Sequence, residues 1–199
     1  MNSIVCEHVR IDRFRKAFCT FVLIAAICLG TSPTAASAQD AWQRDRKAIS
    51  GNPSMASSKE FAVYQTATLD CEGFAARWNR PTAGVEVVET SKVARNQPVF
   101  TFIIFTGCSP DQYGKCNVTA DFRMFDPAGR SFGERIASPV WVGLPPPAKH
   151  SLPLSSEYLG MVVEDKDSLG SYRIIATVTD HVSGTSLTTE QTIVAGPAT

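Results

Sequence analysis

Apolar and polar residues alternate along most of the chain after residue 60, and a period of two is the pattern of β-strands. Residues 117–126 show it most clearly, because four apolar residues that would face inward alternate there with outward-facing ones. Residues 99–106 (VFTFIIFT) are apolar at nearly every position, which predicts a central strand buried on both faces. Further strands are predicted at residues 61–69, 158–164, 172–179 and 185–195, with shorter candidates at 85–89 and 131–137.

Turn-forming residues separate the predicted strands, and one short segment has a helical pattern. Pro127-Ala128-Gly129 is an example of such a turn. Residues 71–79 (CEGFAARWN) predict a helix, because Phe74 and Trp78 are four residues apart and Pro81 follows. Many short strands, regular turns and one short helix predict an all-β fold, an antiparallel β-sandwich.

The first 38 residues differ from the rest and have the three parts of a secretory signal peptide. Residues 1–16 contain four Lys or Arg residues, residues 17–30 are largely apolar, and an Ala-x-Ala site ends at Ala38. A transmembrane helix needs about 20 apolar residues, so this run of 14 is too short to span a bilayer. We therefore expect cleavage after Ala38 and a periplasmic or secreted product, with an uncleaved anchor as the alternative.

Cleavage changes both the length and the charge of the chain. Removing residues 1–38 from the 199 leaves 161 residues, a length that suits a single domain. Residues 39–59 are polar and show no period, so we expect a flexible polar arm there, followed by the folded domain at residues 60–199. The remaining 15 basic and 17 acidic residues give a net charge of −2, which predicts no nucleic-acid partner. No second long apolar run follows, so we expect no stable membrane insertion after cleavage.

Three cysteines remain after cleavage, and two of them suggest a disulfide. Cys108 and Cys116 stand at the end of one predicted strand and the start of the next. An oxidising compartment favours their pairing, and closing a loop of this length stabilises a fold by about 2–3 kcal/mol. Metal binding by this pair is the weaker alternative, because no second pair of Cys or His completes four ligands. We therefore predict no metal site.

Cys71 is then the odd cysteine, predicted to be an unpaired thiol. It could be a buried thiol at the start of the short helix, since cysteines outside disulfides are usually buried. It could also pair with another chain. A catalytic thiolate is the third alternative, but the sequence offers no base to activate it.

Residues 167–174 (DSLGSYRI) resemble the Asp-x-Gly-x-Tyr start of the penultimate strand in immunoglobulin-like sandwiches. In that arrangement the tyrosine hydroxyl binds the backbone at a corner between strands. The resemblance implies that the sandwich is immunoglobulin-like and that Tyr172 is its structural tyrosine corner. Ile174 stands where antibody domains carry their second cysteine, so the disulfide between the sheets would be absent.

A longer series of motifs is similar to that of uncharacterised secreted proteobacterial proteins with a signal peptide and a single immunoglobulin-like β-sandwich domain. The matching residues are Phe-Thr-Gly-Cys108, Pro110-Asp111, Gly114-x-Cys116-x-Val118, Phe125-Asp126-Pro127-x-Gly129, Trp141, the Pro-rich link after it, Leu169-Gly170-x-Tyr172 and Thr179-Asp180. The resemblance covers about residues 60–194 and implies a fold and a compartment, without an activity. Asp70-Cys71-Glu72 departs from it, because that position is usually a polar turn without cysteine.

The sequence has no recognisable pattern for catalysis or cofactor binding, such as Gly-x-Ser-x-Gly or His-Glu-x-x-His. We therefore predict no enzyme activity and no cofactor. The leading hypothesis is a secreted or periplasmic, non-enzymatic interaction or structural module with an unknown envelope protein as its partner. The alternative is a periplasmic small-molecule or glycan-binding domain that uses the loops at one end of the sandwich, around Tyr113 and Trp141. A third hypothesis, a thiol-dependent enzyme or redox partner, would be centred on Cys71.

Overall fold

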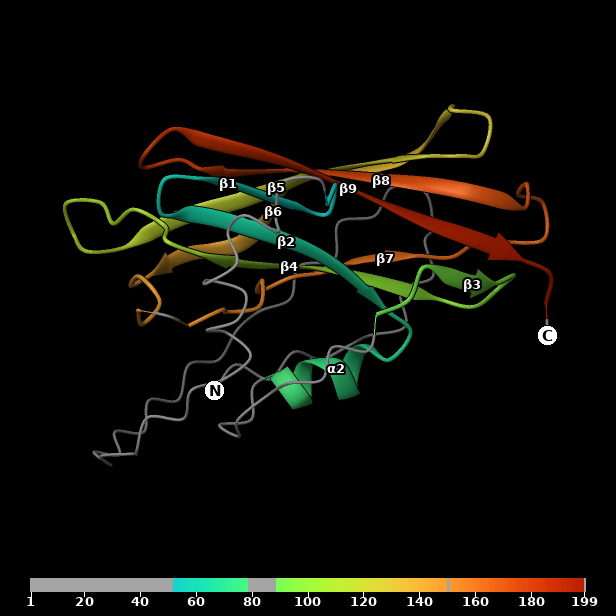
Figure 1. Ribbon diagram of the computed structural model, residues 1–199, viewed down its shortest axis with the longest axis horizontal. Coiled ribbons are helices and arrows are strands. Elements are labelled where there is room, and N and C mark those ends of the chain that lie inside the picture. Colours follow the sequence, from blue (N-terminus) through green and yellow to red (C-terminus); the bar gives the residue numbers. More distant parts are fainter. Residues whose placement is uncertain (1–51, 79–88, 150, 199) are drawn as a thin grey trace.

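A computed structural model describes residues 52–78, 89–149 and 151–198 of the chain. The predicted signal peptide lies outside these ranges, as do most of the predicted arm and most of the candidate strand at 85–89. Within them the chain forms nine strands and one short helix (Figure 1). These elements are β1 (Met55–Ser58), β2 (Phe61–Thr68), α2 (Cys71–Trp78), β3 (Lys92–Ala94), β4 (Val99–Thr106), β5 (Cys116–Phe125), β6 (Ser131–Leu144), β7 (Leu159–Met161), β8 (Gly170–Asp180) and β9 (Thr185–Gly196).

The strands form two sheets that pack face to face (Figure 1). The four-stranded sheet has the order β1-β2-β4-β7, and the five-stranded sheet has the order β3-β9-β8-β5-β6. Neighbouring strands run antiparallel, apart from β3 and β9, which run parallel. The predicted all-β sandwich with one short helix is therefore confirmed.

Several elements differ in extent from the prediction, and β1 was missed. β6 continues to Leu144, well beyond the predicted range 131–137, because it pairs with β5 along its whole length through several register shifts. β7 is shorter than the predicted strand at 158–164. The sequence of β1 (MASS) has no apolar alternation, but its backbone pairs with β2 from Met55 opposite Tyr64 to Ser58 opposite Phe61.

The main hydrophobic core fills the space between the two sheets. Its fully buried side chains include Ile103, Phe105, Phe122, Tyr172 and Ile174. One buried polar side chain, Gln65 of β2, joins the sheets: its Nε2 donates to the carbonyl of Ile174 at 3.2 Å, and its Oε1 accepts from Thr189 Oγ1 at 2.8 Å. Both bonds are needed, because a buried amide without partners would oppose folding.

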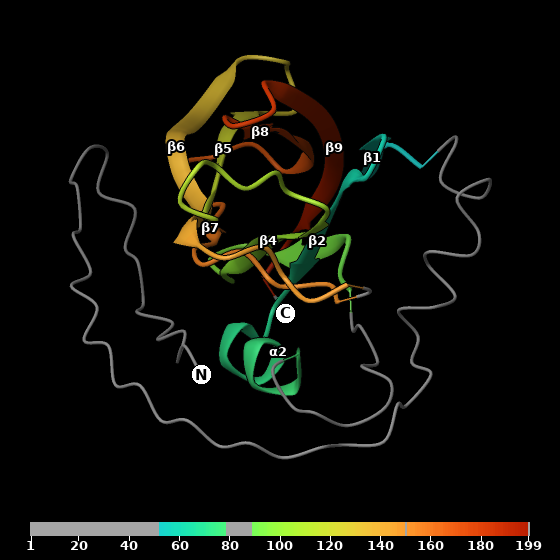
Figure 2. The same cartoon turned by 90° about the vertical axis from the view of Figure 1, so that its left-hand side faces the viewer.

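A second hydrophobic cluster covers the other face of the four-stranded sheet. Phe74 of α2 packs on Phe102 of β4 with ring centroids 5.2 Å apart, and Leu152 and Leu154 belong to the same cluster. Figure 2 shows α2 lying against the side of this sheet that faces away from the other sheet. β4 is therefore buried on both faces, as its continuous apolar sequence predicts.

Short segments bridge the two sheets along both sides of the sandwich. On one side, the N–H of Glu190 in β9 donates to the carbonyl of Pro53, just before β1, at 2.7 Å. On the other side, the N–H of Ser156 donates to the carbonyl of Val140 in β6 at 3.0 Å, and Arg135 of β6 forms an ion pair with Glu157. The outer edges of β9 and β6 are thus partly covered.

Candidate functional site

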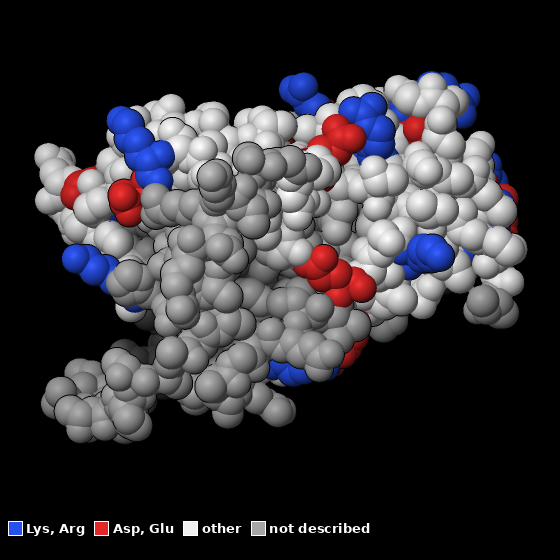
Figure 3. Space-filling model, viewed as in Figure 1, with Lys and Arg blue, Asp and Glu red and all other residues white. Residues whose placement is uncertain are grey.

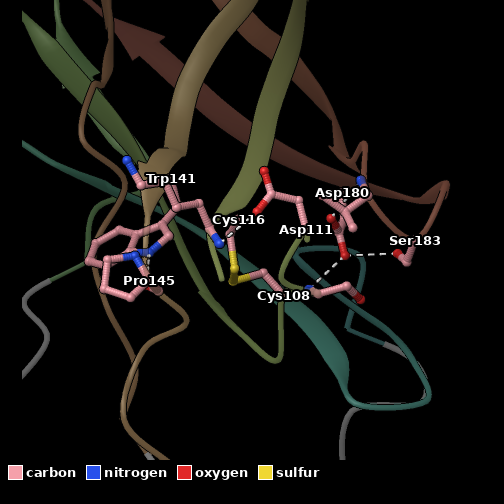
Figure 4. Close-up of a disulfide and its surroundings, with 10 residues drawn as sticks. Cys108, Asp111, Cys116, Trp141, Pro145, Asp180 and Ser183 are labelled. Atoms are coloured by element: carbon pink, nitrogen blue, oxygen red, sulfur yellow. Dashed lines mark hydrogen bonds between the residues drawn. A yellow bond between two sulfur atoms is a disulfide. The ribbon is translucent and has the colours of Figure 1, made fainter. Parts of the chain in front are cut away.

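The predicted disulfide between Cys108 and Cys116 is present at one end of the sandwich (Figure 4). Cys108 follows the end of β4 by two residues and Cys116 begins β5, so the bond closes the neck of the loop between them. Their Cα atoms are 6.1 Å apart, within the usual range for a disulfide. We use "disulfide end" for this end of the sandwich, formed by the loop at residues 107–115 and the turn at residues 181–184.

Asp111 fixes the backbone inside the disulfide loop. Its Oδ1 accepts hydrogen bonds from the N–H groups of Tyr113 at 2.8 Å and Lys115 at 2.9 Å. The N–H of Gly114 also donates to the Asp111 carbonyl at 3.0 Å, and Gly114 has a positive φ of 73°. The side chain of Tyr113, at the tip of this turn, is 76% exposed. An aromatic side chain is therefore presented to solvent by a loop whose backbone is already ordered.

A buried aspartate ties this loop to the neighbouring turn. Asp180, the last residue of β8, is completely buried, and its Oδ2 accepts from the N–H of Ser109 at 2.9 Å and from Ser183 Oγ at 2.8 Å (Figure 4). Its Oδ1 accepts from the N–H of Val182 at 3.1 Å. One carboxylate thus holds both segments of the disulfide end, and its oxygens are compensated for their burial by three donors.

The loop also passes closely over the turn between β1 and β2. Gly107 has a positive φ of 74°, and a Cβ atom added there would lie 1.8 Å from the carbonyl oxygen of Glu60. Glycine is therefore required at this position for two reasons, the left-handed backbone and the close approach.

Trp141 lies near the disulfide end, where its side chain makes contacts that hold the fold together. Its indole is half-buried and packs against Phe105 with centroids 5.5 Å apart, and its Nε1 donates to the carbonyl of Pro145 at 2.9 Å. Trp141 thereby anchors the Pro-rich segment that leads from one sheet to the other. Tyr113 belongs to the loop between β4 and β5, whereas Trp141 belongs to β6.

Tyr172 lies at the start of β8, at the other end of the sandwich from the disulfide. Its hydroxyl donates to the carbonyl of Ser168 at 2.6 Å, which is the kind of backbone bond predicted for it. Its ring packs edge-on against Phe132 with centroids 4.9 Å apart. Burial, and then the nearby carboxylate of Asp167, raise the pKa of the Tyr172 phenol above its usual value.

Cys71 begins α2 and is buried in the second hydrophobic cluster. Its sulfur is part of a disulfide, and the prediction of an unpaired thiol therefore does not hold in this structure. The other half of that bond lies outside the described residues.

The described residues contain neither a metal-binding cluster nor a helix able to cross a membrane. In residues 52–78, 89–149 and 151–198, no group of three or more His, Cys, Asp or Glu side chains could hold a metal ion. Within the same ranges, no helix has the length and apolar character that a membrane span requires. His181, at the disulfide end, shares a hydrogen bond of 2.8 Å between its Nε2 and Thr119 Oγ1.

Comparison with known proteins adds no family to this description. No family model matches the chain, and no curated protein matches it either. Among solved structures, a superoxide reductase (neelaredoxin) from Ignicoccus hospitalis is similar over 56% of this chain and 78% of its own, with 11% identity and a TM-score of 0.35. A family 123 glycoside hydrolase from Clostridium perfringens is similar over 68% of this chain, which spans only 27% of that enzyme, with 9% identity and a TM-score of 0.35.

Proposed function

We propose that this chain is a secreted or periplasmic, non-enzymatic interaction module of the immunoglobulin-like class. Its partner is an envelope protein, which it binds through the disulfide end. The observation that carries the proposal is the preorganised loop that presents Tyr113. Tyrosine supplies a large contact area with few rotatable bonds, and an ordered loop loses little entropy on binding.

The order of the strands supports the immunoglobulin-like part of the proposal. β2, β4 and β7 form one sheet, while β5, β8 and β9 form the centre of the other, and β6 extends this second sheet beyond β5. Immunoglobulin-like domains divide their strands in the same way, with a tyrosine near the start of the penultimate strand. Tyr172 occupies that position in β8. This class, the predicted signal peptide and the Cys108–Cys116 disulfide together favour an oxidising compartment outside the cytoplasm.

The distribution of charge supports recognition by shape more than by long-range attraction. In the part of Figure 3 that is not drawn in grey, acidic and basic side chains are interspersed, and no broad area of a single sign is visible. Electrostatic steering requires such an area. The turn of Tyr113 carries one acidic and one basic residue, Asp111 and Lys115, and therefore no net charge. An exposed aromatic side chain in such a setting is typical of a binding anchor that fills a pocket on a protein partner.

The chain provides a matched control for this proposal. The turn at Asp126 repeats the hydrogen bonds of the turn at Asp111, because Asp126 Oδ1 accepts from the N–H groups of Ala128 and Arg130, both at 2.9 Å. This second turn connects β5 to β6 and so lies at the opposite end of the sandwich. Ala128 occupies the place that corresponds to Tyr113, with the same backbone and no aromatic ring.

The experiment places a photoreactive phenylalanine derivative at position 113 or 128 in cells that secrete the protein. We expect irradiation to cross-link position 113 to one envelope protein and position 128 to none. With that protein purified, the exchange Tyr113→Ala should weaken binding by about 30-fold or more, as for an anchor residue. Thermal stability should stay the same, because the side chain is exposed. Equal cross-linking from both positions, or unchanged affinity of Tyr113→Ala, would reject the proposal.

A further inference from the structure

The chain at the end of β6 has a conformation that its prolines impose. We use "Pro-rich segment" for residues 144–149 (LPPPAK). The ring of a proline fixes φ at about −65°, and a residue that precedes proline is confined to the β or polyproline II region. Pro145 and Pro146 meet both conditions, and the described residues contain no cis peptide bond. The segment therefore forms a short polyproline II helix, which has about three residues per turn.

The exposure of the side chains along the Pro-rich segment repeats with the period of such a helix. Leu144 and Pro147, one turn apart, are half-buried, and each is followed by two exposed residues. The two exposed pairs are Pro145-Pro146 and Ala148-Lys149. Since one turn rises by about 9 Å, the pairs follow each other at this spacing on the solvent side, while Leu144 and Pro147 face the sandwich.

Hydrogen bonds fix the Pro-rich segment at both ends. At its start, Trp141 Nε1 donates to the carbonyl of Pro145 at 2.9 Å, and the two residues lie side by side (Figure 4). At its end, the carbonyl of Ala148 accepts from the N–H of Ser151 at 3.0 Å and from its Oγ at 2.7 Å. The segment is therefore already ordered in the folded protein, and a preorganised ligand loses little entropy on binding.

The middle of the Pro-rich segment keeps its carbonyl groups available. Among the residues that the structure describes, none donates a hydrogen bond to the carbonyl of Pro146 or Pro147. Grooves that bind polyproline II helices are lined by aromatic side chains, against which the proline rings pack. The indole N–H and the phenol O–H of such side chains can donate to a free carbonyl. The exposed rings and the free carbonyls thus match the two kinds of contact that such a groove offers.

We propose that the Pro-rich segment is a docking site for a partner protein with an aromatic-lined groove. One pocket of the groove receives Pro145-Pro146, and the next receives Ala148-Lys149. An acidic side chain beside the second pocket pairs with the exposed ammonium of Lys149, and this charge fixes the direction in which the segment lies in the groove. The inference rests on residues other than Tyr113 and stands whether or not the loop of Tyr113 binds a partner.

Site-specific cross-linking in cells that secrete the protein tests the proposal. Ala148 and Ala128 form a matched pair, because both are exposed alanines that directly follow a proline. A compact diazirine amino acid replaces either of them with little added bulk. We expect irradiation to cross-link position 148 to one protein, at a peptide that contains aromatic residues, and position 128 to none. The proposal is overturned by no product from position 148, by equal products from both positions, or by a cross-linked peptide without aromatic residues.

Calorimetry with the purified partner and the full secreted chain then tests the two exposed pairs. Pro146→Ala removes an exposed ring and releases the constraint on Pro145, so it should weaken binding about 10-fold or more. Lys149→Glu should weaken binding by a similar factor, because the carboxylate would face the acidic side chain of the groove. Pro127→Ala is the control, since it removes an exposed proline at the opposite end of the sandwich, and it should bind as the wild type does.

Circular dichroism checks that each variant is folded. Unchanged affinity in Pro146→Ala or in Lys149→Glu, or an equal loss in Pro127→Ala, overturns the proposal.

Discussion

Replacing Gly107 by alanine tests whether the disulfide loop crosses the β1–β2 turn as closely as described. The backbone at Gly107 is left-handed, and the new Cβ would lie 1.8 Å from the carbonyl oxygen and 2.4 Å from the carbonyl carbon of Glu60. Both atoms belong to the backbone and cannot rotate away. Either the loop or the turn would have to move, at the expense of the hydrogen bonds that hold the disulfide end.

Gly114 supplies the comparison that separates the two effects. Its φ is 73°, nearly the same as the 74° of Gly107, but a Cβ added there would meet nothing within 4 Å. Gly114→Ala should therefore lower the free energy of unfolding by about 1 kcal/mol, the cost of a left-handed alanine less the gain from a stiffer unfolded chain. Gly107→Ala adds a steric term of about 1–3 kcal/mol or more, for a total of about 2–4 kcal/mol.

Urea unfolding followed by tryptophan fluorescence measures both variants, with the disulfide left intact in each. Heating should show the same order: a protein of this length loses about 2–4 °C in Tm per kcal/mol, so the loss should be several degrees larger for Gly107→Ala. Equal losses for the two variants would refute the reasoning, since the close approach to Glu60 would then have no energetic weight.

Three further substitutions have expected effects on stability. Thr101→Val should raise the free energy of unfolding by about 1–2 kcal/mol in urea, because Thr101 Oγ1 is buried and has no hydrogen-bond partner among the described residues; a loss would argue against that burial. Ala137 lies in the β-bulge of β6 opposite Asp121 and has a left-handed backbone, with a φ of 54°. Ala137→Gly should raise the free energy of unfolding by about 0.5–1 kcal/mol, because glycine adopts this conformation without strain; a lower free energy of unfolding would show that the bulge is unstrained. Tyr172→Phe should lower it by about 1 kcal/mol, through loss of the bond to the Ser168 carbonyl. The raised pKa of the Tyr172 phenol also predicts that the stability of the wild-type protein falls as the pH rises above about 10, because the unfolded chain loses the phenolic proton first. The phenylalanine variant has no phenol and should lack this part of the pH dependence.

The sequence predicted those features that depend on short-range patterns. The apolar run of β4 indicated burial on both faces, and the cysteines at the two ends of a loop indicated their disulfide. Strand β1 was not predicted, because its four residues acquire their conformation from β2 and not from their own composition. The repeated pattern Asp-x-x-Gly followed by a basic residue, at 111–115 and 126–130, is a sequence signal that could have identified the ordered turn beneath Tyr113.

The remaining features of the site depend on contacts between distant residues. In the sequence, nothing distinguishes Asp180 from other acidic residues that precede a turn. Only the fold brings its Oδ2 within 2.9 Å of the Ser109 nitrogen. Trp141 was named as a possible binding residue of the alternative hypothesis, and its structural bond, from the indole N–H to the carbonyl of Pro145, is visible only in the fold. Exposure, which distinguishes Tyr113 from Trp141, follows from the packing of the whole sandwich.

The bridges along the two sides of the sandwich have a consequence for how the protein behaves in a crowded compartment. An uncovered strand edge can recruit the same edge of another molecule, and the addition can continue without limit into a fibre. Here Pro53 occupies part of the edge of β9, and residues 156–158 occupy the middle of the edge of β6. Growth by strand addition at these two places would first have to break the bonds that cover them, so β9 and β6 are protected there from adding a further strand.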